Sequence, residues 1–191
     1  MADYKSKKLI YHLTAVKNIP SILEKGLLPR NQLTDFQDVA DKEIIQKRQG
    51  LVLEGHVPFH WFVKNPFDGI VQKTHKDTPF ALIAVERERA SRKNWKILPR
   101  HPLANSEMEL LDYAVGFEAI DWETMNQRDY HDPNCKSVCM AECLAPGTVP
   151  VSQFFAIYVR DTTTERKVRT WVNRQGVTIR HIYVNENMFP R

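Results

Sequence analysis

One acidic side chain, Glu142, interrupts an otherwise apolar stretch at residues 140–145, and it is the residue best placed to do chemistry. The stretch reads MAECLA and ends at a Pro-Gly turn signal. So short a run favours a strand, in which Met140, Glu142 and Leu144 share one face. Burying a lone carboxylate is costly, so it requires a polar partner, a ligand or a shifted pKa. The sequence therefore predicts a carboxylate at a cleft, although a structural Lys or Arg partner would also satisfy it.

A second set of reactive side chains recurs at every fourth position. It consists of His131, Cys135, Cys139 and Cys143. On a helix the outer two would lie about 18 Å apart, whereas zinc ligands converge to within about 2.0–2.3 Å of the ion. His56 and His60 would lie about 13 Å apart on a strand, so they could share a metal only if the strand bends. We therefore predict thiols in the core and no metal site.

The composition is that of an ordinary globular protein, with 42% apolar and 26% charged residues in 191. This length fits a single domain over residues 1–191. The sequence has no apolar run of about 18 residues and no apolar signal segment at its N-terminus. Its three cysteines cannot form a closed disulfide framework. We therefore expect a cytoplasmic protein with reduced thiols.

The net charge of +4 is unevenly distributed. Basic residues gather at residues 85–100 and 160–180, where Trp95 and Trp171 are interleaved with them. Basic stripes with a few aromatic residues suit nucleic acid or another polyanion. A solvated protein surface would give the same pattern, so the charge alone leaves both interpretations open.

Short strands with small helices between them predict an α+β fold, which we expect to consist of two small packed sheets flanked by short helices. Strands are expected at residues 9–14, 57–63, 79–86, 95–98, 140–145, 154–159 and 177–184. Helices are expected between the cap at Asn18 and the stop at Gly26, and at residues 37–49, 120–125 and 162–175. Residues 100–136 otherwise look irregular, and such long segments in compact domains are usually functional or mobile.

Several segments, in order, resemble the DarT family of DNA ADP-ribosyltransferases, the toxins of DarT–DarG-type toxin–antitoxin systems. They are YHLT at residues 11–14 followed by NIPSILEKGLL at 18–28, EIIQKR at 43–48, VPFHWFVKNPF at 57–67 and MAECLAPGTVP at 140–150. The resemblance covers most of the chain and implies an ADP-ribosyltransferase-like core.

The resemblance also implies a site and its partners. It implies Glu142 and Arg48 as catalytic residues and NAD as co-substrate, held by His12, Leu13, Thr14 and Ser21. Residues 32–50 would cover the NAD, and residues 100–137 would present the acceptor base. The implied partners are single-stranded DNA and an antitoxin, an ADP-ribosyl glycohydrolase of the macrodomain or NADAR type. The short chain and the NPFDG stretch at residues 65–69 favour the guanine-modifying branch over the thymine-modifying one.

These residue types suit that chemistry. Breaking the nicotinamide–ribose bond gives an oxocarbenium-like centre, as in glycoside cleavage, and a carboxylate stabilises it more than the ground state. Arg48 stays protonated, so we expect it to position groups and stabilise charge, with Glu142 as the proton acceptor. A base inside a duplex cannot reach such a pocket, so the substrate is expected to be single-stranded or flipped.

Two other functions remain open from the sequence. An RNA-directed transferase of the same fold, like the RNA 2′-phosphotransferases, would rely on several arginines and would not need Glu142. A non-catalytic nucleic-acid-binding module would use the basic stretches alone, and it would bind in a salt-sensitive way without any dependence on NAD.

Overall fold

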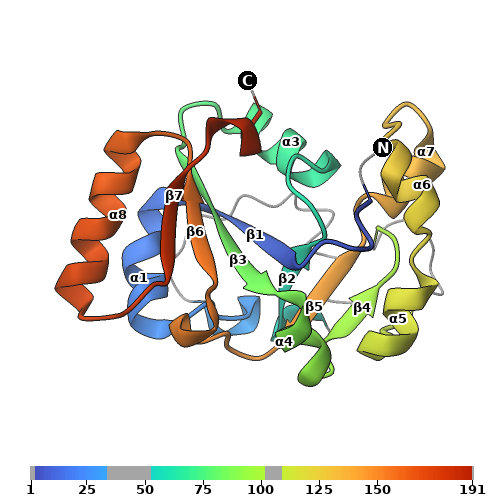
Figure 1. Cartoon of the computed structure of the whole chain (residues 1–191), viewed down its shortest axis with the longest axis horizontal. Coiled ribbons are helices and arrows are strands. Elements are labelled where there is room, and N and C mark those ends of the chain that lie inside the picture. Colours follow the sequence, from blue (N-terminus) through green and yellow to red (C-terminus); the bar gives the residue numbers. More distant parts are fainter. Residues whose placement is uncertain (1–2, 34–52, 102–108, 191) are drawn as a thin grey trace.

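The computed structural model describes residues 3–33, 53–101 and 109–190, and within them seven strands form one sheet (Figure 1). The strands are β1 (Leu9–Ala15), β2 (His56–His60), β3 (Phe80–Glu86), β4 (Lys96–Leu98), β5 (Glu142–Pro146), β6 (Ala156–Val159) and β7 (His181–Val184). Their order across the sheet is β4-β5-β2-β1-β3-β6-β7. The pairs are antiparallel, apart from the parallel pair of β6 and β7.

The α+β class is confirmed, but the expected division into two small sheets is wrong for the described residues, where the strands join into one sheet. The reason lies in β1. On one side it pairs with β3 along its whole length, from Leu9–Glu86 to Ala15–Phe80. On the other side it reaches β2 through the pair Tyr11–His60. This single strand therefore connects the two halves.

The helices are α1 (Ile19–Lys25), α3 (Pro66–Thr74), α4 (Arg87–Arg92), α5 (Tyr113–Ala119), α6 (Trp122–Gln127), α7 (Pro133–Val138) and α8 (Thr162–Gln175). The predicted helices after Asn18 and at residues 162–175 are confirmed, and the predicted helix at residues 37–49 lies outside the described residues. In the described part of the chain, none of the helices has both the length and the apolar character needed to cross a membrane.

The segment expected to be irregular carries α5, α6 and α7 in its described part. Local capping explains two of these helices, because a side-chain oxygen at the N-cap satisfies the exposed N–H groups of a first turn. Asp121 accepts from the Thr124 N–H at the start of α6, and Asp132 accepts from the Asn134 and Cys135 N–H groups at the start of α7.

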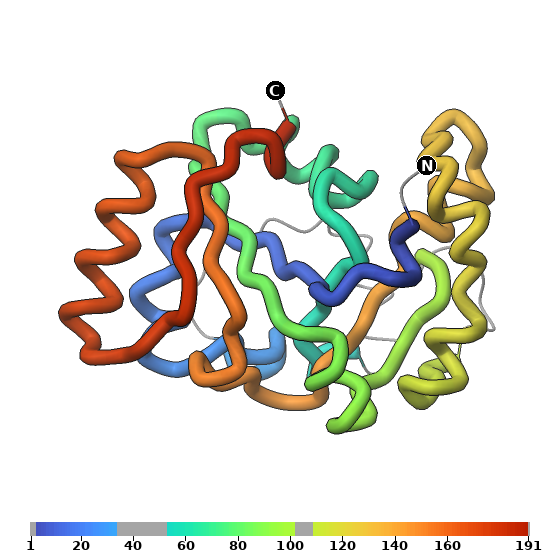
Figure 2. The backbone as a smooth tube through the Cα atoms, in the orientation of Figure 1, coloured from blue at the N-terminus to red at the C-terminus, as the bar shows by residue number. Residues whose placement is uncertain are grey.

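Helices cover both faces of the sheet (Figure 1). On one face α1 and α8 pack at the β6–β7 end, and α5, α6 and α7 pack near β4 and β5, all in one large apolar cluster. On the other face α3 packs through Val71 against Leu13, Phe80, Leu82 and Phe189. Figure 2 shows the N-terminal segment beside α6 and α7 before it enters β1, where the Tyr4 N–H donates to Asn126 Oδ1 at 2.9 Å.

The three cysteines are buried, as predicted for core thiols. Cys135, Cys139 and Cys143 are each at most 1% exposed, whereas His131 lies on the surface. The Cys135 thiol donates to the Thr124 carbonyl at 3.2 Å, and the Cys139 thiol to the Met125 carbonyl at 3.7 Å. These thiols therefore belong to the packing between α6 and α7.

Candidate active site

Glu142 is the first residue of β5 and is only 6% exposed. It lies between His60 of β2 and Leu98 of β4 in the sheet. Leu144, two residues on, packs with Leu53 and Leu98, whereas Cys143 belongs to the larger cluster on the opposite face. The predicted strand and the predicted face of Glu142 are thus confirmed. Met140 does not share that strand, because the chain still turns there, with its N–H donating to the Ser137 carbonyl at 3.2 Å.

Three residues form a row across neighbouring strands, which we call the active-site row. Tyr11 of β1 lies opposite His60 of β2, and His60 lies opposite Glu142 of β5. Residues directly opposite each other in a sheet project to the same face, and strands lie about 4.8 Å apart. The row therefore brings Tyr11, His60 and Glu142 together on one face, with the backbones of β1 and β5 about 10 Å apart.

His12 lies next to this row, but the alternation of the strand sends its side chain toward the other face. Its ring lies 5.7 Å from that of Phe59, which also belongs to the opposite face. Its Nδ1 lies 2.8 Å from the Pro58 carbonyl oxygen. Because a carbonyl only accepts, Nδ1 carries the proton, and the bond fixes the orientation of the imidazole between β1 and β2.

The ladder between β1 and β2 is interrupted at Pro58. The Arg87 N–H donates to the Lys8 carbonyl, and the Val16 N–H donates to the Pro79 carbonyl, so even-numbered residues of β1 bond to β3. Odd-numbered residues, including Leu13, therefore direct their N–H and C=O toward β2. Continuing the register from Tyr11–His60 would set Leu13 opposite Pro58, which has no N–H to donate.

This interruption bears on the backbone N–H and C=O of Leu13, which point toward β2. Within the described residues, the pairing of β1 with β2 is confined to Tyr11–His60, and the Pro58 carbonyl faces the ring of His12. The Leu13 N–H and C=O thus point toward the side of β1 where, among the described residues, pairing with β2 stops at Tyr11–His60. One donor and one acceptor in that arrangement match the C=O and NH₂ of a primary amide.

The other predicted NAD residues are distributed around this edge. Thr14 is 5% exposed, and its Oγ1 accepts from Asn18 Nδ2 at 3.3 Å. Ser21 is exposed on α1, a helix that packs on the face opposite Glu142. Arg48 lies outside the described residues. His12, Leu13 and Thr14 thus lie on β1, the strand that carries Tyr11 of the active-site row, but the side chains of His12 and Thr14 project to the face opposite Glu142, the face on which α1 and Ser21 lie.

From the sequence, His60 is half of a candidate metal pair and part of the resembling segment at residues 57–67, and Tyr11 belongs to the resembling segment at residues 11–14, but neither is predicted to lie near Glu142. His60 is 5% exposed, and its ring stacks on Phe67 of α3 with 5.2 Å between the centroids. Only the strand register reveals that both residues neighbour Glu142, so no spacing in the sequence could have found them. Burial raises the pKa of Tyr11 to about 12, which keeps its hydroxyl protonated.

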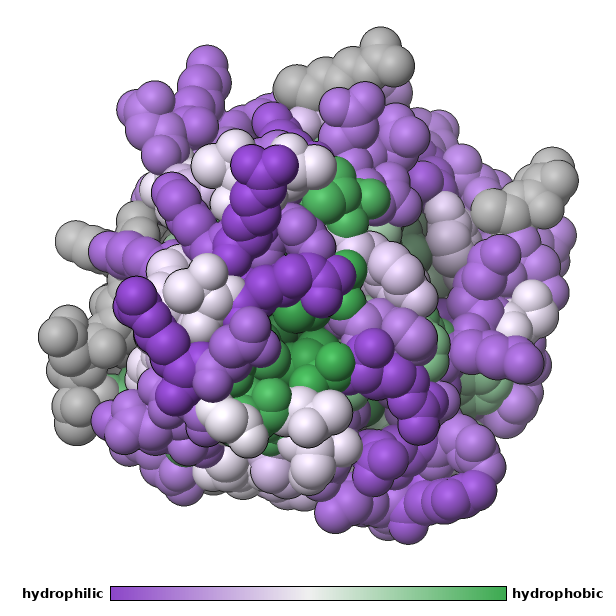
Figure 3. All heavy atoms as spheres, turned by 60° about the vertical axis from the view of Figure 1, so that its left-hand side comes forward, coloured by the Kyte–Doolittle hydropathy of each residue, from purple (hydrophilic) through white to green (hydrophobic). Residues whose placement is uncertain are grey.

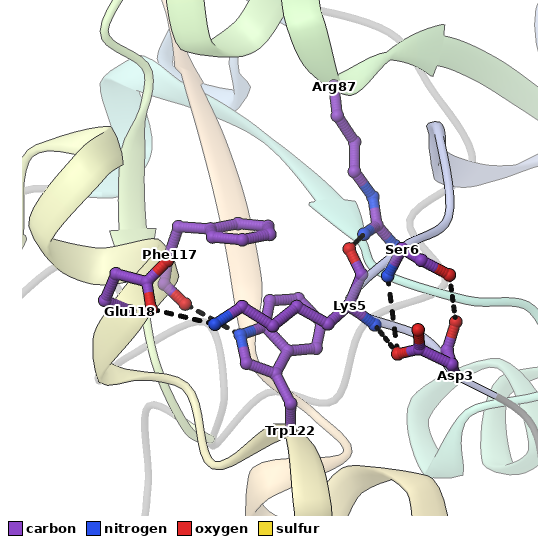
Figure 4. A network of polar contacts seen from close by, with 7 residues as sticks. All are labelled: Asp3, Lys5, Ser6, Arg87, Phe117, Glu118 and Trp122. Carbon is purple, nitrogen blue, oxygen red and sulfur yellow. Dashed lines mark hydrogen bonds and ion pairs between the residues drawn. The ribbon is translucent and has the colours of Figure 1, made fainter.

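Arg87 belongs to the basic stretch at residues 85–100, but its guanidinium is buried and donates to backbone carbonyls. It donates to Tyr4 O at 2.7 Å, Lys5 O at 3.2 Å, Leu9 O at 3.1 Å and Trp61 O at 2.9 Å. Figure 4 shows it reaching the N-terminal segment near Trp122, whose ring lies 5.6 Å from it. Burial lowers its pKa to about 10.

The Arg87 network therefore fixes where β1 begins and where β2 ends, and it supports the active-site row. Other cations of this stretch are also engaged, since Arg92 pairs with Glu88 and Lys96 with Asp112. The prediction that the whole stretch grips a polyanion must therefore exclude Arg87.

The second basic stretch lies mainly on α8. Arg166, Lys167 and Arg174 are exposed there, and Figure 3, which turns the α8 side forward, shows a mostly hydrophilic surface around a central apolar area. Val168 and Val172 pack α8 onto the face opposite Glu142. The cations of α8 therefore do not border the active-site row.

Comparisons with known proteins identify the family to which the chain belongs. Residues 11–190 match the family model described as DarT, ssDNA thymidine ADP-ribosyltransferase. The fold is similar to that of Thermus sp. 2.9 DarT in complex with ADP-ribosylated ssDNA, with a TM-score of 0.83, 19% identity and coverage of 96% of each chain. It is likewise similar to Thermus sp. 2.9 DarT in complex with NAD+, with a TM-score of 0.78, 17% identity and coverage of 97% of this chain and 98% of that one.

A longer relative also matches. A DNA ADP-ribosyl transferase–DNA ADP-ribosyl glycohydrolase fusion protein of Thermosipho africanus is 25% identical over an alignment 191 positions long, which covers 89% of this chain and 47% of that protein. The chain thus spans about half the length of this relative.

Proposed function

Because this chain belongs to the DarT family of ssDNA ADP-ribosyltransferases, we propose that it transfers ADP-ribose from NAD to a base in single-stranded DNA. The observation that carries the proposal is the position of Glu142 on the active-site row, next to the part of β1 where described pairing with β2 stops at Tyr11–His60. Thermus sp. 2.9 DarT, which has the same fold, has been solved with NAD+ and with ADP-ribosylated ssDNA.

NAD meets the open edge of β1 through its carboxamide. The Leu13 N–H donates to the amide oxygen, and the Leu13 carbonyl accepts from the amide nitrogen. His12 and Thr14 hold the ribose or diphosphate portion beside this edge. Ser21 and Arg48 are kept as predicted contacts, with Arg48 stabilising negative charge on the diphosphate or the acceptor group.

Glu142 acts on the reacting ribose. The bond between C1′ and the nicotinamide nitrogen breaks, and nicotinamide leaves with the bonding electrons. The carboxylate of Glu142 stabilises the resulting positive charge on the sugar. A nitrogen of the base then bonds to C1′, and its proton passes to Glu142, so the charge is balanced.

The base and the biological role belong to the same proposal. Guanine is the prediction from the sequence, and thymidine is the nucleoside named in the family description. Asn65 and Asp68 of the NPFDG stretch are at most 2% exposed, so this stretch presents neither side chain to a base.

The chain acts as the toxin of a toxin–antitoxin pair, and its partner is an ADP-ribosyl glycohydrolase of macrodomain or NADAR type. The fusion in Thermosipho africanus supports this pairing.

The test is incubation of a mixed-sequence single-stranded oligonucleotide with the protein and NAD, followed by digestion to nucleosides and mass spectrometry. We expect one nucleoside to carry ADP-ribose, and its identity decides between guanosine and thymidine. Unmodified DNA that is nevertheless bound in a salt-sensitive way would support the non-catalytic binding module instead.

A further inference from the structure

Five aromatic rings form an unbroken chain across β1, β6 and β7. The ring of Tyr11 lies 6.3 Å from that of Tyr158, which lies 5.4 Å from that of Tyr183. Tyr183 stacks on His181 at 5.1 Å, and His181 lies 5.4 Å from Phe155. We call these five residues the aromatic shelf.

Strand pairing places the shelf on the same face as Glu142. Tyr11 belongs to the active-site row and lies opposite Ala84 of β3. Tyr158 lies opposite Leu82, two residues from Ala84, and opposite Tyr183 of β7. Because opposite residues and every second residue share a face, Tyr158, Tyr183 and His181 continue the active-site row toward the far edge of the sheet. Phe155 precedes β6 and joins the shelf through its contact with His181.

The shelf is accessible at its outer end, where Tyr183 is 42% exposed. Arg180, just before β7, holds its guanidinium 5.9 Å from the centroid of Phe155. Beyond the end of β6, Arg160 lies 5.8 Å from the ring of Phe189. One cation, Arg180, thus lies at the Phe155 end of the shelf, and a second, Arg160, lies next to Phe189, outside the shelf.

Arg160 and Phe189 also line a groove of about 630 Å³, together with Lys73 and Lys76 of the α3 region. Two acids line it as well. One of them, Asp161, is engaged as the N-cap of α8, where it accepts from the Thr164 N–H at 2.7 Å. Asp77 is the other acid, so the groove has a small excess of positive charge.

Accessible aromatic rings with cations nearby are typical of surfaces that bind unpaired nucleic acid, because bases stack on rings and phosphates pair with Lys and Arg. In the shelf, Tyr183 is the exposed ring and the other four are partly buried. We propose that the aromatic shelf and the groove beside it bind the single-stranded DNA that flanks the target base. This inference rests on the proposed function, since it extends the DNA path away from Glu142. The shelf also contributes cross-strand packing, so the test must separate stability from binding.

Geometry makes the proposal depend on DNA length. Tyr183 lies five strand spacings from Glu142, or about 24 Å, so a short oligonucleotide that fills the catalytic site does not reach it. The shelf should therefore act on an oligonucleotide of about 16 nucleotides and not on one of about 4, the range of single-strand site sizes on small binding folds.

The experiment compares Tyr183→Ala, Tyr183→Phe and Val184→Ala with the wild-type protein. Val184 is the matched control because it is 43% exposed on the same strand and projects to the opposite face. The apparent KM for each oligonucleotide is measured at saturating NAD. The affinity for the longer oligonucleotide is measured without NAD by fluorescence anisotropy, and thermal unfolding measures the stability of each variant.

Loss of one stacked base should raise the KM and Kd for the longer oligonucleotide at least about fivefold in Tyr183→Ala. The short oligonucleotide, Tyr183→Phe and Val184→Ala should behave like wild type. An unchanged KM for the long oligonucleotide, or an equal change for both lengths, would overturn the shelf while leaving the transferase intact. If the wild-type protein modifies neither oligonucleotide, the proposed function fails, and the anisotropy measurement still decides whether the shelf binds DNA.

Discussion

Asp68 provides the sharpest test of the energetics around the active-site row. It lies in the first turn of α3 and is 2% exposed, and its Oδ1 has no hydrogen-bond partner in the described structure. Asn65 caps the same turn by accepting from the Asp68 N–H at 2.9 Å, and Phe67 carries the stack onto His60. We expect Asp68→Asn to stabilise the protein above neutral pH, because it removes a buried acid and keeps an acceptor oxygen.

The sign and size follow from its pKa. Burial raises the pKa of Asp68 from 3.8 to about 7, against the lowering effect of the hydrogen bond with Asn65. The unfolded chain releases this proton near pH 3.9. The contribution of the neutral carboxyl to folding is therefore complete below about pH 4 and is lost progressively as the pH rises to about 7. At about 1.4 kcal/mol for each pH unit, the loss reaches at most about 4 kcal/mol.

Urea unfolding of both proteins between pH 4.5 and 8 measures this difference. The free energy of unfolding of Asp68→Asn should exceed that of wild type by an amount that grows up to about pH 7 and then stays constant. Asp121→Asn is the control, because the hydrogen bond from Thr124 lowers the pKa of Asp121 and gives the opposite pH dependence. A gap between wild type and Asp68→Asn that does not vary with pH would refute the reasoning.

Two further predictions concern the frame of the site. Pro58→Ala supplies the N–H that the β1–β2 ladder lacks, and this N–H should bond to the Leu13 carbonyl. The KM for NAD should then rise two- to tenfold, which corresponds to the loss of about one hydrogen bond to the carboxamide. An unchanged KM with an unchanged fold would contradict the proposed amide site. Arg87→Ala removes the donor of four carbonyls and should cost about 3–5 kcal/mol in urea unfolding. Arg92→Ala, at an exposed ion pair, should cost under about 1 kcal/mol, and similar losses for the two variants would show that Arg87 is not structural.

Much of the fold could be predicted from the sequence because the strands, and the residues that end strands and helices, are recognised from short local patterns. The run around Glu142 predicts β5 through its short apolar stretch and turn, and Gly26 ends α1 with a φ of +83°, where a Cβ would lie 2.7 Å from the Val149 carbonyl oxygen. A glycine at that position is required by both the backbone angle and the close approach.

The rest depended on pairing between distant segments, which local patterns do not encode. That Tyr11, His60 and Glu142 form one row follows from the register of three strands more than 40 residues apart in sequence. Arg87 looked like a surface cation, because nothing in its neighbours shows that four carbonyls surround it. Its burial becomes evident only when the N-terminal segment and the end of β2 are seen together.

The measurement that tests the central claim most directly is ADP-ribose transfer by Glu142→Gln. The variant keeps the size of the side chain and its position on β5, and it removes the negative charge to which we assign the stabilisation of the sugar cation. With NAD and a single-stranded oligonucleotide, we predict that Glu142→Gln forms adduct at least about a hundredfold more slowly than wild type, while its circular dichroism spectrum is unchanged. Glu118→Gln, a control at an exposed position, should form adduct at the wild-type rate. An undiminished adduct with Glu142→Gln would contradict the account.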